Sequence, residues 1–111
     1  MTLQENKIIY ELLFRVKCSR ADEFEKHCRD VMGLLDNHLG FLSLAYSKRV
    51  DIGAEKGFCT YRAEIFFDSL DSLNSYQKNL VPKIRSSSTQ FGDDAKIKER
   101  KTFKIFCTKS A

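Results

Sequence analysis

The stretch from Phe58 to Asp68 most constrains how this chain can fold, because its apolar and polar side chains alternate. Alternation with a period of two is typical of a β-strand whose two faces meet different surroundings. One predicted face is apolar and carries Cys59, Tyr61, Ala63, Ile65 and Phe67. The other is mixed and carries Thr60, Arg62, Glu64 and Phe66. We therefore expect a strand that other strands flank and that helices cover on its apolar face.

The segments 7–17, 40–50 and 96–108 also alternate, and we expect them to pair with this strand. A polar, glycine-bearing stretch, 51–57, predicts a hairpin loop before Phe58. In the last segment, the alternation predicts Phe103, Ile105 and Cys107 on one face. The other face of that segment would then carry Thr102, Lys104 and Phe106.

Two intervening segments have helical periodicity. Ser19 is expected to cap the first helix, which ends near His38 because Gly40 follows. Asp68 or Ser69 is expected to cap the second helix. Pro82 cannot donate a backbone N–H, so it either kinks this helix or starts a new short one.

The expected order is therefore β-α-β-β-α-β, the ferredoxin-like arrangement of the α+β class. It has a four-stranded antiparallel sheet with helices on one face. The chain has 111 residues, of which 42% are hydrophobic, and this favours one domain spanning residues 1–111.

The uncovered face of the sheet has two interpretations. In the first, it meets a second copy, and the two sheets close into a dimeric α+β barrel. Apolar groups on that face (Ile9, Leu13, Phe41, Phe66 and Phe106) favour this, because such a surface is unusual in a monomer. Charged groups would pair across the interface. The predicted dimer face is Glu11, Arg15, Arg62, Glu64, Phe66 and Lys104.

In the second interpretation, the face stacks RNA bases. Lys56-Gly57-Phe58 resembles the start of the third-strand signature of RNA-recognition motifs, but Thr60 stands where that signature needs an aromatic ring. The net charge of +4 is a mild excess. We therefore expect a homodimer and no nucleic-acid partner.

The cysteines (Cys18, Cys28, Cys59 and Cys107) form no C-x-x-C pair, so we expect buried thiols rather than a metal site. The N-terminus is polar and lacks the pattern of a signal peptide, which predicts a cytoplasmic protein. No apolar run approaches the ~20 residues that span a membrane.

The chain carries several short patterns in this order: Ile8-Ile-Tyr-Glu, Gly40-Phe41, Tyr61-Arg62, Tyr76 with Pro82-Lys-Ile-Arg85, Phe91-Gly92 and Glu99-Arg100-Lys101. Together they resemble a family of short bacterial proteins known as a domain of unknown function. That family looks like a branch of the dimeric α+β barrels, which include the antibiotic-biosynthesis-type monooxygenases. The chain departs from the family pattern in the helices. His27, Val31 and Leu80 stand where the family is expected to have Trp, His and His. The resemblance implies a fold and a homodimer, with no established activity.

The resemblance also implies a ligand site between the helices and the sheet. Its candidate lining is Tyr10, His27, Tyr46, Tyr61 and Tyr76. Lys83, Arg85 and Arg100 form either a solvated surface or an anion-binding rim. No residues stand out as catalytic, and no cofactor is expected. The sequence favours a non-catalytic binding or structural module with a possible small-molecule ligand. The alternative is a cofactor-independent monooxygenase-like enzyme acting on a small aromatic substrate.

Overall fold

The computed structural model describes residues 6–51, 53 and 55–111. The N-terminal residues 1–5, on which the expectation of a polar N-terminus rests, lie outside this range. So do Ile52 and Ala54 of the predicted hairpin loop.

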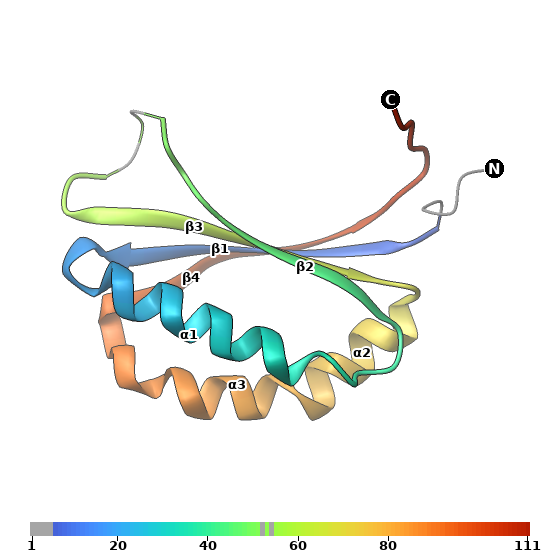
Figure 1. Ribbon diagram of the computed structural model, residues 1–111, viewed down its shortest axis with the longest axis horizontal. Coiled ribbons are helices and arrows are strands. Elements are labelled where there is room, and N and C mark those ends of the chain that lie inside the picture. The colour runs from blue at the N-terminus through green and yellow to red at the C-terminus, as the bar shows by residue number, and fades with distance from the viewer. Residues whose placement is uncertain (1–5, 52, 54) are drawn as a thin grey trace.

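A four-stranded antiparallel sheet forms one layer of the molecule (Figure 1). Its strands are β1 (Ile8–Lys17), β2 (Phe41–Lys48), β3 (Phe58–Phe67) and β4 (Ala95–Lys104), in the spatial order β2-β3-β1-β4. The Phe58 strand is thus an inner strand, as its two-faced pattern predicted. The ferredoxin-like α+β order is confirmed.

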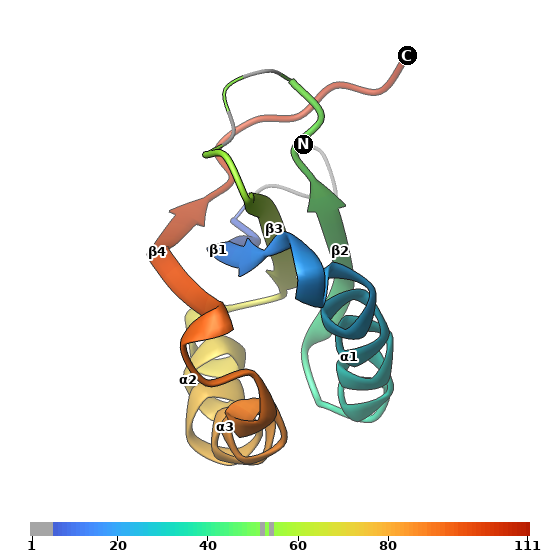
Figure 2. The same ribbon diagram turned by 90° about the vertical axis from the view of Figure 1, so that its left-hand side faces the viewer.

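The helices form a second layer on one face of the sheet (Figure 2). They are α1 (Ala21–Leu34), α2 (Leu70–Asn79) and α3 (Val81–Ser88), with short 3-10 segments η1 (Cys18–Arg20) and η2 (Thr89–Asp94). On β3, the side chains of Tyr61, Ala63, Ile65 and Phe67 are buried beneath this layer. The apolar face of the strand therefore forms the core, and burial of such side chains is the main stabilising contribution to folding.

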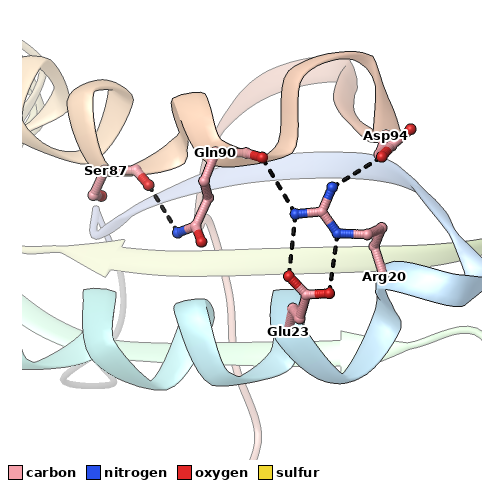
Figure 3. A network of polar contacts seen from close by, with 5 residues as sticks. All are labelled: Arg20, Glu23, Ser87, Gln90 and Asp94. Atoms are coloured by element: carbon pink, nitrogen blue, oxygen red, sulfur yellow. Dashed lines mark hydrogen bonds and ion pairs between the residues drawn. The ribbon is translucent and has the colours of Figure 1, made fainter.

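The expectation that Ser19 caps α1 is wrong. Residues 18–20 form η1, and α1 begins only at Ala21, with no side-chain cap. Arg20 instead joins the start of α1 to η2 (Figure 3). Its guanidinium donates to Glu23 at 3.1–3.2 Å, to Asp94 at 2.9 Å and to the carbonyl of Gln90 at 3.2 Å. These bonds hold two segments that border the candidate site.

Ser69 caps α2, because its hydroxyl accepts the backbone N–H of Ser72 at 3.2 Å. Pro82 lies in the first turn of α3, so of the two alternatives for this proline it starts a new helix. The second helical segment of the sequence is therefore a pair of short helices, and Leu80 and Val81 at their junction pack against the core.

Two β-bulges move side chains to faces that simple alternation does not predict. A bulge between Phe41 and Ser43 lets Phe41 pack against the core, so its expected place on the open face is wrong. A second register shift lies in the pairing of β1 with β4. There the consecutive residues Leu13 and Phe14 pair with Glu99 and Ile97, which are two positions apart.

Beyond that second shift, the faces of β4 are the reverse of the prediction. Phe103 pairs with Ile9 and therefore lies on the open face, 47% exposed. Lys104 pairs with Ile8, whose side chain is in the core, so the expectation that Lys104 lies on the open face is wrong. Phe106 follows the end of β4.

Only part of the expectation for the cysteines is confirmed. Cys28 is buried and Cys59 is half-buried, but Cys18 and Cys107 are exposed. Cys18 falls in η1, and Cys107 follows the end of β4, so neither is carried into the core by a regular element.

Candidate functional site

A cavity of about 710 Å³ lies between the sheet and the helices. Ligand pockets commonly have volumes of ~300–1,000 Å³, so this one has room for a small molecule. Rings and aliphatic side chains form most of its wall. The main lining residues are Tyr10, Leu12, Phe14, Tyr46 and Ile65 from the sheet, Phe24, His27, Cys28 and Val31 from α1, Tyr76, Val81, Ile84 and Arg85 from α2 and α3, and Phe91, Ile97 and Arg100 from η2 and β4.

Three of the predicted tyrosines, Tyr10, Tyr46 and Tyr76, line this cavity. The rings of Tyr10 and Tyr76 meet edge to face, with centroids 6.3 Å apart. Burial raises the pKa of Tyr46, and burial followed by the nearby Tyr10 raises the pKa of Tyr76 to about 12. Both phenols therefore keep their protons near neutral pH. The hydroxyl of Tyr46 is hydrogen-bonded to Cys28, so Tyr76 is the phenol that can donate to a ligand.

Tyr61, which we also expected to line the site, lies outside this cavity. Its hydroxyl donates to Glu25 Oε2 at 2.6 Å, and its ring packs 5.0 Å from that of Phe24. Burial, and then the hydrogen bond to Glu25, raise the pKa of Tyr61. The residue thus fixes α1 to β3 and supports the cavity wall from behind.

His27 lines the cavity from α1, and its contacts define its tautomer. Its Nε2 lies 2.9 Å from Ser88 Oγ, and the single hydroxyl proton of Ser88 is donated to the carbonyl of Ile84 at 2.7 Å. Ser88 must therefore accept a hydrogen bond from Nε2–H, which leaves the lone pair of a neutral ring on Nδ1.

The His27 ring is uncharged at neutral pH, and no hydrogen bond to its lone pair is found among the described residues. Burial lowers the pKa of His27 from its usual 6.5, with Asp30 acting weakly in the opposite direction, so the ring is neutral at pH 7. Among the described residues, every fully buried side-chain nitrogen or oxygen has a hydrogen-bond partner. Nδ1 of His27 has none in the hydrogen bonds found there, so it keeps access to the cavity or to solvent.

The lowered pKa of His27 predicts a pH dependence of stability. In the unfolded chain, His27 takes up a proton near pH 6.5, whereas in the folded protein it does so only at lower pH. The free energy of unfolding should therefore fall as the pH drops from 7 through this interval. Urea unfolding at pH 7 and pH 5 should show a smaller loss for His27→Gln than for the parent chain. An equal loss in both would show that the ring is not held neutral.

Basic side chains line one side of the cavity. Arg85 on α3 and Arg100 on β4 belong to the lining, whereas Lys83 does not, so only part of the predicted basic rim lies here. None of the described lining residues is acidic. Within the same part of the chain, no carboxylate forms an ion pair with Arg85 or Arg100, and Lys96 pairs with Asp93 at 3.5 Å. Both arginines are exposed, and in the described part of the chain neither has an ion-pair partner.

The described residues contain no group of three His, Cys, Asp or Glu side chains suited to a metal ion. None of the helices in that part of the chain has the length and apolar character needed to cross a bilayer. The cavity between the sheet and the helices is therefore the candidate functional site.

Ser88 and Phe91 are site residues that the sequence did not indicate. Ser88 is the last of three consecutive serines in α3, and its hydroxyl orients His27. Phe91 packs its ring 5.4 Å from that of His27. The four-residue spacing of Ile84 and Ser88 places both on one face of α3. Because Ile84 is apolar and would face the core, this spacing could have indicated that Ser88 also faces inward.

Neither a protein-family model nor a curated protein sequence matches this chain. Solved structures do match. A variant of SnoaB, a cofactor-independent oxygenase from Streptomyces nogalater, aligns with a TM-score of 0.73 at 17% identity, covering 93% of this chain and 96% of that one. A candidate antibiotic biosynthesis monooxygenase from Bacillus cereus aligns with a TM-score of 0.67 at 16% identity, covering 96% and 99%. This chain has the fold of the antibiotic biosynthesis monooxygenases.

The expected likeness to this group is thus confirmed for the fold. A hydroxynitrile lyase from Passiflora edulis also matches, with a TM-score of 0.62 at 16% identity, covering 95% of this chain and 99% of the lyase. Because a lyase shares this fold, the fold leaves the reaction open. Function has to be argued from the cavity.

Proposed function

We propose that this protein is a cytoplasmic homodimer that binds a small aromatic molecule carrying an acidic group, without converting it. The cavity of about 710 Å³ between sheet and helices carries this proposal. Its aromatic and aliphatic wall suits a planar apolar body, and the phenol of Tyr76 offers a hydrogen-bond donor inside.

The acidic group is inferred from Arg85 and Arg100. Both line the cavity, and neither has a carboxylate partner among the described residues. A guanidinium binds a carboxylate through parallel N–H donors, and such charge-assisted hydrogen bonds are stronger than neutral ones. An aromatic carboxylate fits this arrangement, with its ring inward and its charge toward the arginines.

The homodimer is inferred from the open face of the sheet. Proteins of this fold are often dimeric. Phe66, Ile9 and Phe103 lie side by side across three strands and form an apolar row on that face. A surface of this kind favours burial against another chain.

Charged side chains of both signs lie beside this row on the open face. Glu64 pairs with Arg62 at 3.2 Å and Glu99 with Lys101 at 3.2 Å. Glu11 lies between Glu64 and Lys101 in the strand register. A second copy offers the same mixture of signs, so the two faces can pair their charges. Arg15 is already engaged, because it donates to Glu55 at 2.6 and 2.8 Å.

Isothermal titration calorimetry with a matched pair of probes tests the ligand proposal. The probes are 2-naphthoate and its uncharged analogue 2-naphthamide. We expect 2-naphthoate to bind with a dissociation constant of about 1 mM or lower, as a ligand of its size allows. We expect 2-naphthamide to bind at least about tenfold more weakly. Equal affinities for the two would remove the argument for an acidic substituent.

A second candidate function is cofactor-independent oxygenation, and the neutral ring of His27 is the observation that favours it. Its Nδ1 could accept a proton from the hydroxyl of a bound quinol. The resulting anion is electron-rich and would react with O₂. One oxygen atom would enter the ring, the other would leave as water, and the quinol would supply all the electrons, giving a hydroxyquinone.

Oxygen uptake separates the two functions. With a quinol carboxylate such as gentisate, a binding module should consume no more O₂ than the buffer does. If uptake exceeds that background, His27→Gln should abolish the excess, because the glutamine side chain cannot act as a base. Excess uptake that survives in His27→Gln would refute the assignment of His27 as the base. Any uptake above background would refute a purely non-catalytic role.

A further inference from the structure

Cys18 and Cys59 form a pair of thiols at one end of the sheet. Their Sγ atoms lie 3.3 Å apart although the residues are 41 positions apart in the chain. Neither belongs to the cavity lining. Cys18 is exposed and Cys59 is half-buried, and neither is part of a disulfide.

The backbone holds the two cysteines side by side. Cys59 pairs with Val16 in the register of β1 and β3, and Phe58 pairs with Lys17. Immediately beyond this pair, the N–H of Cys18 donates to the carbonyl of Gly57 at 2.9 Å. The two chain segments are therefore joined by hydrogen bonds on both sides of the thiols. A disulfide bond of ~2.05 Å needs the sulfur atoms to approach by only about 1.3 Å.

We infer that Cys18 and Cys59 are a reversible dithiol–disulfide site that reacts with small disulfides such as oxidised glutathione. In the first step, the Cys18 thiolate attacks the small disulfide, forms a mixed disulfide and releases one thiolate. In the second step, the Cys59 thiolate attacks Cys18 Sγ and displaces the second. The two released thiolates take up the two cysteine protons. The cysteines are oxidised to one disulfide, and one glutathione disulfide is reduced to two thiols.

The surroundings decide the order of attack. Cys18 is exposed and can meet a small disulfide in solution. Burial and the contact with Cys18 raise the pKa of Cys59, against a weaker opposite effect of Lys48. Cys59 therefore holds less thiolate than an ordinary cysteine and is a poor first nucleophile. Its position beside Cys18 suits it to the second, intramolecular step.

The other cysteines do not compete for this pairing. Cys28 is buried in α1. Cys107 follows β4, near the point where Ile105 donates to the carbonyl of Lys7 at the start of β1. Cys18 follows the other end of the same ten-residue strand. A strand of that length spans roughly 33 Å, and Figure 1 shows the C-terminus at the opposite end of the sheet from the β1–α1 turn.

Intact-protein and peptide mass spectrometry test the inference. The parent chain is equilibrated in mixtures of reduced and oxidised glutathione, and the remaining thiols are alkylated. The expected result is a loss of two hydrogens and one cross-linked peptide pair, containing Cys18 and Cys59. Cys107→Ser should keep this cross-link. Cys18→Ser should lose it, although the exposed position should leave the fold intact.

Thermal unfolding gives an independent reading, because a cross-link that closes a long loop restricts the unfolded chain. The oxidised parent should melt at least about 5 °C above its reduced form, and Cys18→Ser should show no such rise. The inference is overturned if Cys18 accumulates only as a glutathione adduct while Cys59 stays free. It is also overturned if the cross-link involves Cys107.

Discussion

Replacing Arg85 and Arg100 together by glutamine will lower the affinity for 2-naphthoate by at least about tenfold. Hydrogen bonds to charged groups contribute roughly 1.5–3 kcal/mol, and 1.4 kcal/mol corresponds to about a factor of ten. Both side chains line the cavity and lack a carboxylate partner among the described residues. Affinity for 2-naphthamide should change by less than about twofold, because the amide has no charge to lose. Isothermal titration calorimetry of both probes gives the two ratios.

Lys83→Gln is the matched control for this experiment. Lys83 lies on the same helix, α3, but does not line the cavity. Its removal deletes one positive charge near the site and no direct contact with a ligand. We expect the affinity for 2-naphthoate to stay within about twofold at physiological salt, where screening acts over ~8 Å. An equal loss in the control would mean that net charge, and not the two arginines, attracts the acid.

Phe103→Glu is expected to weaken the homodimer by at least about thirtyfold. Phe103 is 47% exposed and continues the apolar row of Phe66 and Ile9 on the open face. Losing a buried aromatic ring at the centre of an interface costs about 2 kcal/mol or more, which corresponds to about thirtyfold. Sedimentation velocity across a concentration series measures the dissociation constant of the dimer.

A glutamate on the other side of the molecule controls for surface charge. Leu70 is 56% exposed at the start of α2, within the helix layer. Leu70→Glu should leave the dissociation constant of the dimer unchanged, and circular dichroism should show that both variants remain folded. If Phe103→Glu dimerises as tightly as the parent chain, the open face is not the interface.

The inner strands could be predicted because their patterns are undisturbed. Along β3, alternate side chains are buried beneath the helices as the sequence indicated, ending with Phe67 at full burial. Simple alternation failed in β4 and β2, which contain bulges. The bulge in β4 changes the face of the side chains that follow it, and the bulge in β2 changes the face of Phe41, which precedes it. Lys104 and Phe41 were misplaced for this reason. A bulge leaves no clear signature in one sequence, because it changes pairing and not composition.

The lining of the cavity was predicted in part. Tyr10, His27, Tyr46 and Tyr76 line the cavity because they belong to the apolar faces of regular elements. Tyr61 lies on the same face of β3, but its hydroxyl reaches Glu25 and the ring is held outside the cavity. Arg100 lines the cavity only because the β4 bulge places it on the helix side, opposite Leu12. The tautomer of His27 depends on Ser88, 61 positions away, and no local pattern encodes that contact.

The most direct test of the central claim is a map of amide chemical shifts, recorded by nuclear magnetic resonance while 2-naphthoate is added to the labelled protein. The cavity site predicts that the largest changes fall on the helix segments around His27, Tyr76 and Arg85. Saturable changes at these positions, with the open face unaffected, would confirm that the cavity takes an aromatic acid. Changes confined to the strand positions of Ile9, Phe66 and Phe103, or none at any concentration, would contradict the account.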